Sequence, residues 1–103
     1  ADDQLAYDEK AFEKRLQKPP EAAARLKAFR ETLARVEGFD PPTLEAALKS
    51  FVEEQEIKIG DIIHALRVAV TGKAVGAGMF ETLALLGRQR CLSRIDRTLE
   101  RLQ

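Results

Sequence analysis

The sequence predicts an all-α fold, a compact bundle or cage of about six short helices. Apolar residues recur at the three- and four-residue spacing of a helix along most of the chain, and strand-like alternation is scarce. Prolines and glycines interrupt this pattern and divide it into short segments. With 103 residues, of which 45% are hydrophobic, the chain is large enough to bury one modest core.

A pair of prolines separates the first two predicted helices. The periodic pattern of residues 7–16 predicts a helix that ends before Pro19 and Pro20. Pro20 fits the first turn of a second helix, because an N–H group at that position would have no partner within the helix, and Gly38 ends this helix. The apolar face of the second helix comprises Leu26, Phe29, Leu33 and Val36.

Two further helices are predicted between Asp40 and Gly72. Asp40 is a good N-cap with Pro41 at the first helical position, and the third helix extends to Gln55. The fourth helix covers about residues 59–70, with Gly72 as its C-terminal stop. The side chains expected to point inward are Leu44, Ala47, Leu48, Phe51 and Val52 on the third helix, and Ile59, Ile62, Ile63, Leu66 and Val70 on the fourth.

The irregular part of the sequence lies between residues 72 and 78, where three glycines in seven residues predict a loop. A short apolar helix is expected over residues 80–86, and Gly87 separates it from the last helix. The inward face of the last helix comprises Cys91, Leu92, Ile95, Leu99 and Leu102. Five arginines of this helix are expected to face mostly outward: Arg88, Arg90, Arg94, Arg97 and Arg101.

The balanced total charge hides an asymmetry between the two halves of the chain. Residues 1–57 carry nine Lys and Arg against 13 Asp and Glu, whereas residues 58–103 carry eight against four. A basic half is a feature of proteins that bind polyanions such as nucleic acids. The charge pattern also suits a helical protein-interaction module, in which the basic last helix docks an acidic partner.

The sequence contains no set of residues typical of an active site or a metal site. His64 is the single histidine and Cys91 the single cysteine, and they are predicted on different helices. We therefore assign no catalytic and no metal-binding residues, and expect a partly buried His64 and a buried Cys91. The lone cysteine and the absence of a run of about 18 apolar residues predict a cytoplasmic chain without membrane contact.

A candidate binding site lies where the glycine-rich loop meets the next helix. The start of a helix near Gly78 presents unpaired N–H groups, and an aromatic ring at Phe80 can stack on an unpaired base. Arg67, on the preceding helix, can reach a phosphate or a base edge. The same residues suit a second interpretation, in which Met79 and Phe80 belong to the core and Arg67 forms a surface ion pair.

The segment of residues 59–73, IGDIIHALRVAVTGK, closely resembles the anticodon-binding region of glutamyl-tRNA synthetases, where the pattern is approximately HPLRxALTG. The resemblance continues through GAGMFE at residues 76–81 and LLGRQR at residues 85–90. Upstream, YDEKA at residues 7–11 and FDPPTLE at residues 39–45 also resemble this family. The resemblance therefore covers nearly the whole chain.

This resemblance implies that the chain is the all-α anticodon-binding domain of a class I synthetase, a helical cage that holds the anticodon loop of tRNA-Glu. The parent enzyme would use ATP and Mg²⁺ to attach glutamate to tRNA-Glu. The 103-residue fragment would need no cofactor and would be inactive by itself, because it lacks the catalytic domain. The family's anticodon contacts map onto Arg67, Gly76, Ala77, Gly78, Met79 and Phe80. The family often has Thr and Pro in place of Gly76 and Ala77.

The resemblance also implies a domain organisation and a set of partners. Residues 1–18 would be a helical connector from the preceding part of the parent enzyme, and residues 19–103 the anticodon-binding domain. The partners would be the anticodon loop of tRNA-Glu and the catalytic domain of the same chain, and we expect a monomer. Two alternatives stay open: the protein-interaction module, and a truncated paralogue that keeps the fold but has lost anticodon reading.

Overall fold

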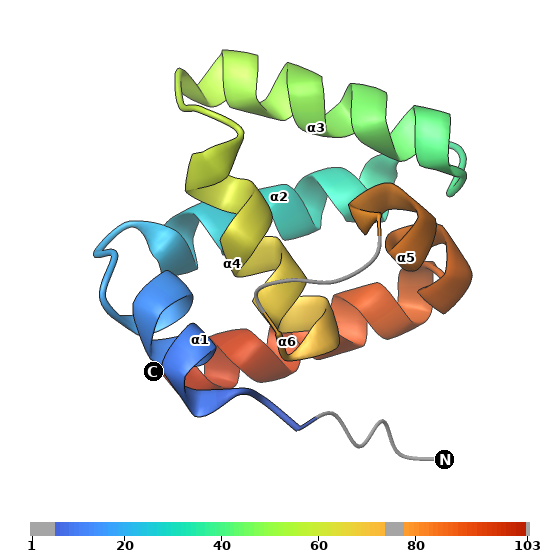
Figure 1. Cartoon of the computed structure of the whole chain (residues 1–103). Coiled ribbons are helices and arrows are strands. Elements are labelled where there is room, and N and C mark those ends of the chain that lie inside the picture. Colours follow the sequence, from blue (N-terminus) through green and yellow to red (C-terminus); the bar gives the residue numbers. More distant parts are fainter. Residues whose placement is uncertain (1–5, 74–77, 103) are drawn as a thin grey trace.

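The computed structural model describes residues 6–73 and 78–102, and all regular secondary structure within these ranges is helical (Figure 1). The elements in chain order are α1 (Glu9–Phe12), the π-helix η1 (Glu13–Gln17), α2 (Ala22–Arg35), α3 (Pro41–Gln55), α4 (Gly60–Thr71), α5 (Met79–Leu86) and α6 (Arg88–Leu102). This order confirms the predicted bundle of about six short helices. In the described part of the chain, no helix has the length and apolar character needed to cross a bilayer.

Local sequence signals set the ends of α3 and α4 as predicted. The carboxylate of Asp40 caps α3, since it accepts hydrogen bonds from the N–H group of Thr43 at 3.3 Å and from its hydroxyl at 2.8 Å. These hydrogen bonds lower the pKa of Asp40. At the C-terminal end of α4, Gly72 has a φ angle of 83°, a left-handed conformation that favours glycine. Its N–H group donates to the carbonyl of Val68 at 2.7 Å.

Helix α4 lies at the centre of the bundle and packs against α1, η1, α2 and α6 (Figure 1). Its buried residues cover more than one side of the helix, as expected for a helix with several neighbours, while His64, Arg67 and Thr71 share a side that is only partly buried. The buried residues are Ile62, Ala65, Leu66, Val68, Ala69 and Val70. The position of α4 at the centre means that its C-terminal end, where the glycine-rich segment begins, is held by several neighbours.

Several details of the predicted pattern are wrong. Pro20 was expected in the first turn of the second helix, but α2 begins only at Ala22. Ile59 was expected to point inward, but its exposed fraction is 43% because it precedes the first turn of α4. The helix predicted over residues 7–16 is an α-helix only to Phe12 and then widens into η1, in which Lys18 donates to the carbonyl of Glu13 five residues earlier. Phe12 and Leu16 are both buried on this short helical segment.

The N-terminal helices share one hydrophobic core with the rest of the bundle. Phe12 and Leu16 join residues of α2 to α6 in a single buried cluster. The ring of Tyr7 packs edge-on against Phe12, and its hydroxyl is 2.8 Å from that of Thr98 on α6. The predicted boundary between a connector and a domain at residue 18 stays a prediction. In the structure, α1 and η1 pack against α4 together with α2 and α6.

Candidate nucleic-acid interface

The segment that joins α4 to α5 begins at the C-terminal end of α4, which is hydrogen bonded to residues just before α1 and on α6. The N–H group of Asp8 donates to the carbonyl of Gly72 at 2.7 Å. Arg94 of α6 donates from Nη1 to the carbonyl of Val70 at 2.5 Å. The last carbonyls of a helix have no partner within it, so these two donors satisfy groups that would otherwise need water. They also fix where the segment leaves α4.

Thr71 links this helix end to the first residues of the segment. Its hydroxyl donates to the carbonyl of Arg67 at 2.7 Å, and it accepts from the N–H group of Lys73 at 3.2 Å. The hydroxyl therefore links the last turn of α4 to the backbone of Lys73, which follows the helix. Lys73 is exposed immediately after this point.

The structure places the predicted contact residues in different environments. Arg67 lies partly buried on α4, between the buried Leu66 and Val68. Gly78 is exposed at the N-cap of α5, and Phe80 is partly buried against the core. Met79 is only 4% exposed, so its side chain is part of the core. The two other predicted residues, Gly76 and Ala77, lie outside the described residues.

The first turn of α5 carries a carboxylate of its own. Glu81 occupies the third position of the helix and folds back so that its Oε1 fills the space that a Cβ at Gly78 would take. The carbonyl of Gly78 accepts from the N–H group of Thr82 at 3.0 Å and from its hydroxyl at 2.8 Å. A carboxylate at the positive end of the helix repels phosphate and attracts donors such as the amino group of cytosine. This end of α5 therefore suits a base edge better than a phosphate.

Arginines of α6 were expected to face mostly outward, but two of them turn toward neighbouring helix ends. Arg88 donates from Nη2 to the carbonyl of Val36, next to the C-terminal end of α2, and its guanidinium lies over the ring of Phe39 at 5.5 Å from the ring centre. Arg94 likewise donates a hydrogen bond to the carbonyl of Val70, near the C-terminal end of α4. Helix ends attract such cations because their carbonyls are unpaired and carry the negative end of the dipole.

Arg101 is also engaged within the fold. Its guanidinium lies over the rings of Phe12 and Tyr7, at 4.5 and 5.1 Å from their centres, and donates to the carboxylate of Glu9 at 2.6 Å. Together with Arg88 and Arg94, it shows that much of the positive charge of residues 58–103 stabilises the fold. The charge asymmetry of the sequence therefore overstates the number of cations that face a polyanion.

A group of basic side chains on η1 and α4 was missed by the sequence analysis. We call it the His64 cluster; it comprises Lys14, Arg15, His64 and Arg67. Burial lowers the pKa of the His64 imidazole, and the positive charges of Arg15, Arg67 and Lys14 lower it further. The three-residue spacing of His64 and Arg67 on one helix was visible in the sequence, but nothing there placed η1 beside α4.

Cys91 has the packing role that the sequence predicted. It is fully buried, and its Sγ donates to the carbonyl of Leu83 at 3.5 Å. Burial raises the pKa of its thiol to about 12, which the nearby Arg94 only partly offsets. A thiol in this state is no nucleophile at neutral pH. In the described ranges, the structure shows no group of three or more His, Cys, Asp or Glu side chains placed to hold a metal ion.

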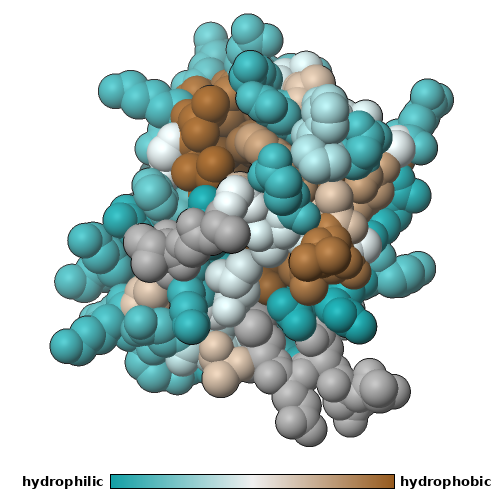
Figure 2. All heavy atoms as spheres, turned by 45° about the vertical axis from the view of Figure 1, so that its right-hand side comes forward, coloured by the Kyte–Doolittle hydropathy of each residue, from teal (hydrophilic) through white to brown (hydrophobic). Residues whose placement is uncertain are grey.

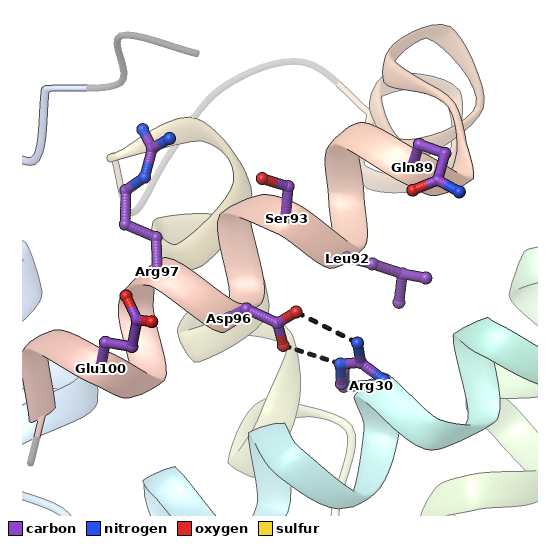
Figure 3. Close-up of a pocket in the computed structure, with 7 residues that line it drawn as sticks. All are labelled: Arg30, Gln89, Leu92, Ser93, Asp96, Arg97 and Glu100. Atoms are coloured by element: carbon purple, nitrogen blue, oxygen red, sulfur yellow. Dashed lines mark hydrogen bonds and ion pairs between the residues drawn. The ribbon is translucent and has the colours of Figure 1, made fainter. Parts of the chain in front are cut away.

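The groove between α2 and α6 is polar and is closed by an ion pair. It has a volume of about 370 Å³ and contains Arg30 and Asp96, whose side chains point toward each other (Figure 3). Arg30 donates from Nε and Nη2 to the two carboxylate oxygens of Asp96, at 2.7 and 3.1 Å. This bidentate geometry joins the two helices and leaves Arg30 occupied by a protein carboxylate.

Few large apolar side chains of the described residues are exposed to a protein partner. On the face seen in Figure 2, hydrophobic areas are separate and lie among hydrophilic side chains. Leu85 and Ile59 are the exposed large hydrophobic residues in the described part of the chain, at 88% and 43% exposure. Single exposed apolar residues are common on protein surfaces, whereas large contiguous patches indicate docking sites.

Comparisons with known proteins agree on one kind of domain. A family model described as "Anticodon binding domain" matches residues 1–99. A glutamate–tRNA ligase 2 of Rubrobacter xylanophilus is 41% identical over 107 aligned residues, which cover 98% of this chain and 20% of that protein. A glutamate–tRNA ligase 1 of Gluconacetobacter diazotrophicus is 44% identical over 91 residues, covering 88% of this chain and 19% of that protein.

The fold also matches a solved structure. A glutamate tRNA ligase from Elizabethkingia meningosepticum, crystallised in complex with its amino acid, superposes with a TM-score of 0.88 at 22% sequence identity. The match covers 99% of this chain and 20% of that chain. The present chain thus spans about a fifth of the length of the relatives it matches.

Proposed function

The chain belongs to the family of anticodon binding domains, and from this premise we propose that it binds the anticodon loop of tRNA-Glu as one domain of a glutamate–tRNA ligase. The names of its relatives support this choice of tRNA. The remainder of such a protein would activate glutamate with ATP and Mg²⁺ in the cytoplasm. Residues 1–18 would lead from that part into the domain, and the whole would act as a monomer.

The observation that carries this proposal is the fixed start of the segment between α4 and α5. Hydrogen bonds from Asp8 and Arg94 hold the end of α4. Arg67 lies one turn before this point, and the first turn of α5 follows the segment. Proteins read single-stranded RNA loops with side chains that hydrogen bond to base edges and stack on bases. A rigid start reduces the ordering that such binding requires.

The predicted residues would have distinct roles in this interface. The guanidinium of Arg67 would donate to a base edge or a phosphate, and the ring of Phe80 would stack on a base. Gly78 would allow close approach of the RNA to the backbone. Met79 would contribute only backbone groups, because its side chain is in the core. For Gly76 and Ala77, the proposal rests on the resemblance to the family alone.

A binding titration with two RNAs tests the proposal. The domain is titrated into a fluorescently labelled anticodon stem-loop of tRNA-Glu and into the same stem-loop with a changed anticodon, at several salt concentrations. We expect tighter binding of the unchanged anticodon, with an affinity that falls as salt rises, because bound cations release phosphate counterions. Equal, salt-insensitive affinity for both RNAs would favour the protein-interaction alternative.

A further inference from the structure

The N-terminal helices run alongside α4 in the opposite direction. Asp8, at the start of this segment, is hydrogen bonded to Gly72 at the C-terminal end of α4. Seven residues later, Arg15 acts electrostatically on His64, which lies eight residues before Gly72. Both α1 and η1 pack against α4 between these points. The His64 cluster therefore continues along α4 from the place where the segment to α5 begins.

The cluster brings like charges together. Lys14 is exposed, whereas Arg15, His64 and Arg67 are partly buried. The Nε of Arg15 is enclosed and has no hydrogen-bond partner among the described residues. This part of the side chain is therefore enclosed by the fold, and its charge, like those of Lys14 and Arg67, acts on His64. Repulsion between such groups is unfavourable unless an anion offsets it, and sites of this kind often have a binding role.

We propose that the His64 cluster binds a phosphodiester group of the RNA backbone beside the anticodon loop. This inference rests on the proposed function and adds a second contact to it. The guanidinium of Arg15 would hold the phosphate oxygens and Lys14 would act as a point charge. Arg67, the residue of the cluster nearest to the C-terminal end of α4, would connect the phosphate site to the residues that face the bases. The carboxylate of Glu81 at the start of α5 makes the cluster the better phosphate site of the two.

His64 makes this site sensitive to pH. The charged groups that act on it are Arg15 and Lys14 from η1 and Arg67 from its own helix. Among the described residues of α1, α2 and α6, which also pack against α4, no charged group acts on it in this way. A bound phosphate reverses the surrounding field and favours the imidazolium. The pKa of His64 therefore rises on RNA binding, and by linkage the affinity for RNA increases as the pH falls.

Removing one cation of the cluster tests the phosphate site. Lys14→Gln is compared with Lys49→Gln, which removes an exposed lysine of α3 that pairs with Glu45 on its own helix. For Lys14→Gln, we expect the slope of log affinity against log salt to fall by about one and the affinity to drop about fivefold near 0.1 M salt. The drop should be equal for both anticodons, since a phosphate contact carries no sequence information.

Two outcomes separate this inference from the proposed function. If Lys14→Gln and Lys49→Gln bind the stem-loop equally while the unaltered domain binds it well, the phosphate site is overturned and the proposed function stands. If the unaltered domain binds neither stem-loop, both are overturned.

The single histidine offers an independent measurement in the unaltered chain. NMR titration of the His64 ring protons gives its pKa without RNA and with saturating stem-loop, and no other imidazole overlaps the signal. We expect the pKa to rise with RNA and to rise less in Lys14→Gln, whose remaining contacts hold the phosphate less firmly. Inorganic phosphate at equal ionic strength should raise it less than RNA does. An unchanged His64 pKa at saturating RNA would overturn the inference.

Discussion

Arg94 on α6 donates a hydrogen bond to the carbonyl of Val70, two residues before the glycine that ends α4. The two residues are 24 positions apart, and the segment between them contains Gly78 and Phe80 of the candidate interface. The same arginine receives a hydrogen bond at its own carbonyl from Thr98, whose hydroxyl contacts Tyr7. The end of α4 is therefore tied to both termini of the described chain through α6.

Replacing Arg94 should weaken both the fold and the interface. In Arg94→Met, the carbonyl of Val70 loses a charged donor, and we expect the free energy of unfolding to fall by about 1.5–3 kcal/mol. RNA affinity should fall as well, because the start of the segment is less well fixed. Urea unfolding followed by circular dichroism measures the first effect. Arg90→Met, at an exposed position of the same helix, is the matched control, and equal destabilisation in both would contradict the assigned role.

Arg67→Ala should affect binding more than stability. Loss of a guanidinium contact to a base or phosphate is expected to weaken stem-loop binding by about 1–3 kcal/mol. The unfolding midpoint should change little, since Arg67 is partly exposed on the surface of α4. Arg35→Ala removes an exposed cation of α2 and serves as the control. Normal affinity of Arg67→Ala, with discrimination against the changed anticodon intact, would place the recognition elsewhere.

Two substitutions at Phe80 separate its packing from its stacking. Phe80→Ala should lower both stability and RNA affinity, because the ring packs partly against the core. Phe80→Leu keeps much of the apolar volume, so stability should largely return while RNA binding stays weaker by about 1–3 kcal/mol. Thermal unfolding and the stem-loop titration report the two effects. Full recovery of binding in Phe80→Leu would show that the residue acts only through the core.

Gly78→Ala tests whether RNA approaches the backbone at the start of α5. The φ and ψ angles of Gly78, −51° and 132°, are open to alanine, and the added Cβ meets only the carboxylate end of the flexible Glu81. We expect a loss of stability of at most about 1 kcal/mol, the usual effect of alanine at an N-cap. Stem-loop affinity should fall further than this. An affinity that follows stability alone would rule out close approach at residue 78.

The thiol of Cys91 should react only when the protein unfolds. Its pKa of about 12 lies above the ordinary value, so the folded state disfavours the thiolate. The corresponding contribution to stability is complete below the ordinary thiol pKa and is lost as the pH rises toward the folded value. Labelling with iodoacetamide at pH 8 should follow the urea unfolding curve. Between pH 8 and 10, stability should fall more steeply in the unaltered chain than in Cys91→Ala. Rapid labelling of the folded protein would contradict this burial.

Much of the fold follows from the sequence alone because its signals are local. Asp40 and Pro41 begin α3, and Gly72 ends α4, through contacts within a few residues. Helical periodicity likewise identifies the apolar side of each helix, which suffices to predict an all-α bundle with residues such as Leu33 and Leu48 in its core. The same local resemblance to one family located the segment between α4 and α5 as the candidate interface.

Which helix covers which is decided only by the tertiary structure. Periodicity gives the direction of a side chain about its own helix axis, but not the neighbour that it meets. The long side chain of an arginine can also reach a neighbouring helix from a position that faces solvent. Arg88 and Arg94 were expected to face solvent, but they donate hydrogen bonds at the C-terminal ends of α2 and α4. The His64 cluster arises for the same reason, since Arg15 and His64 become neighbours only when η1 packs along α4. Long-range contacts of this kind depend on how the whole core packs, which the sequence around the contacting residues does not reveal.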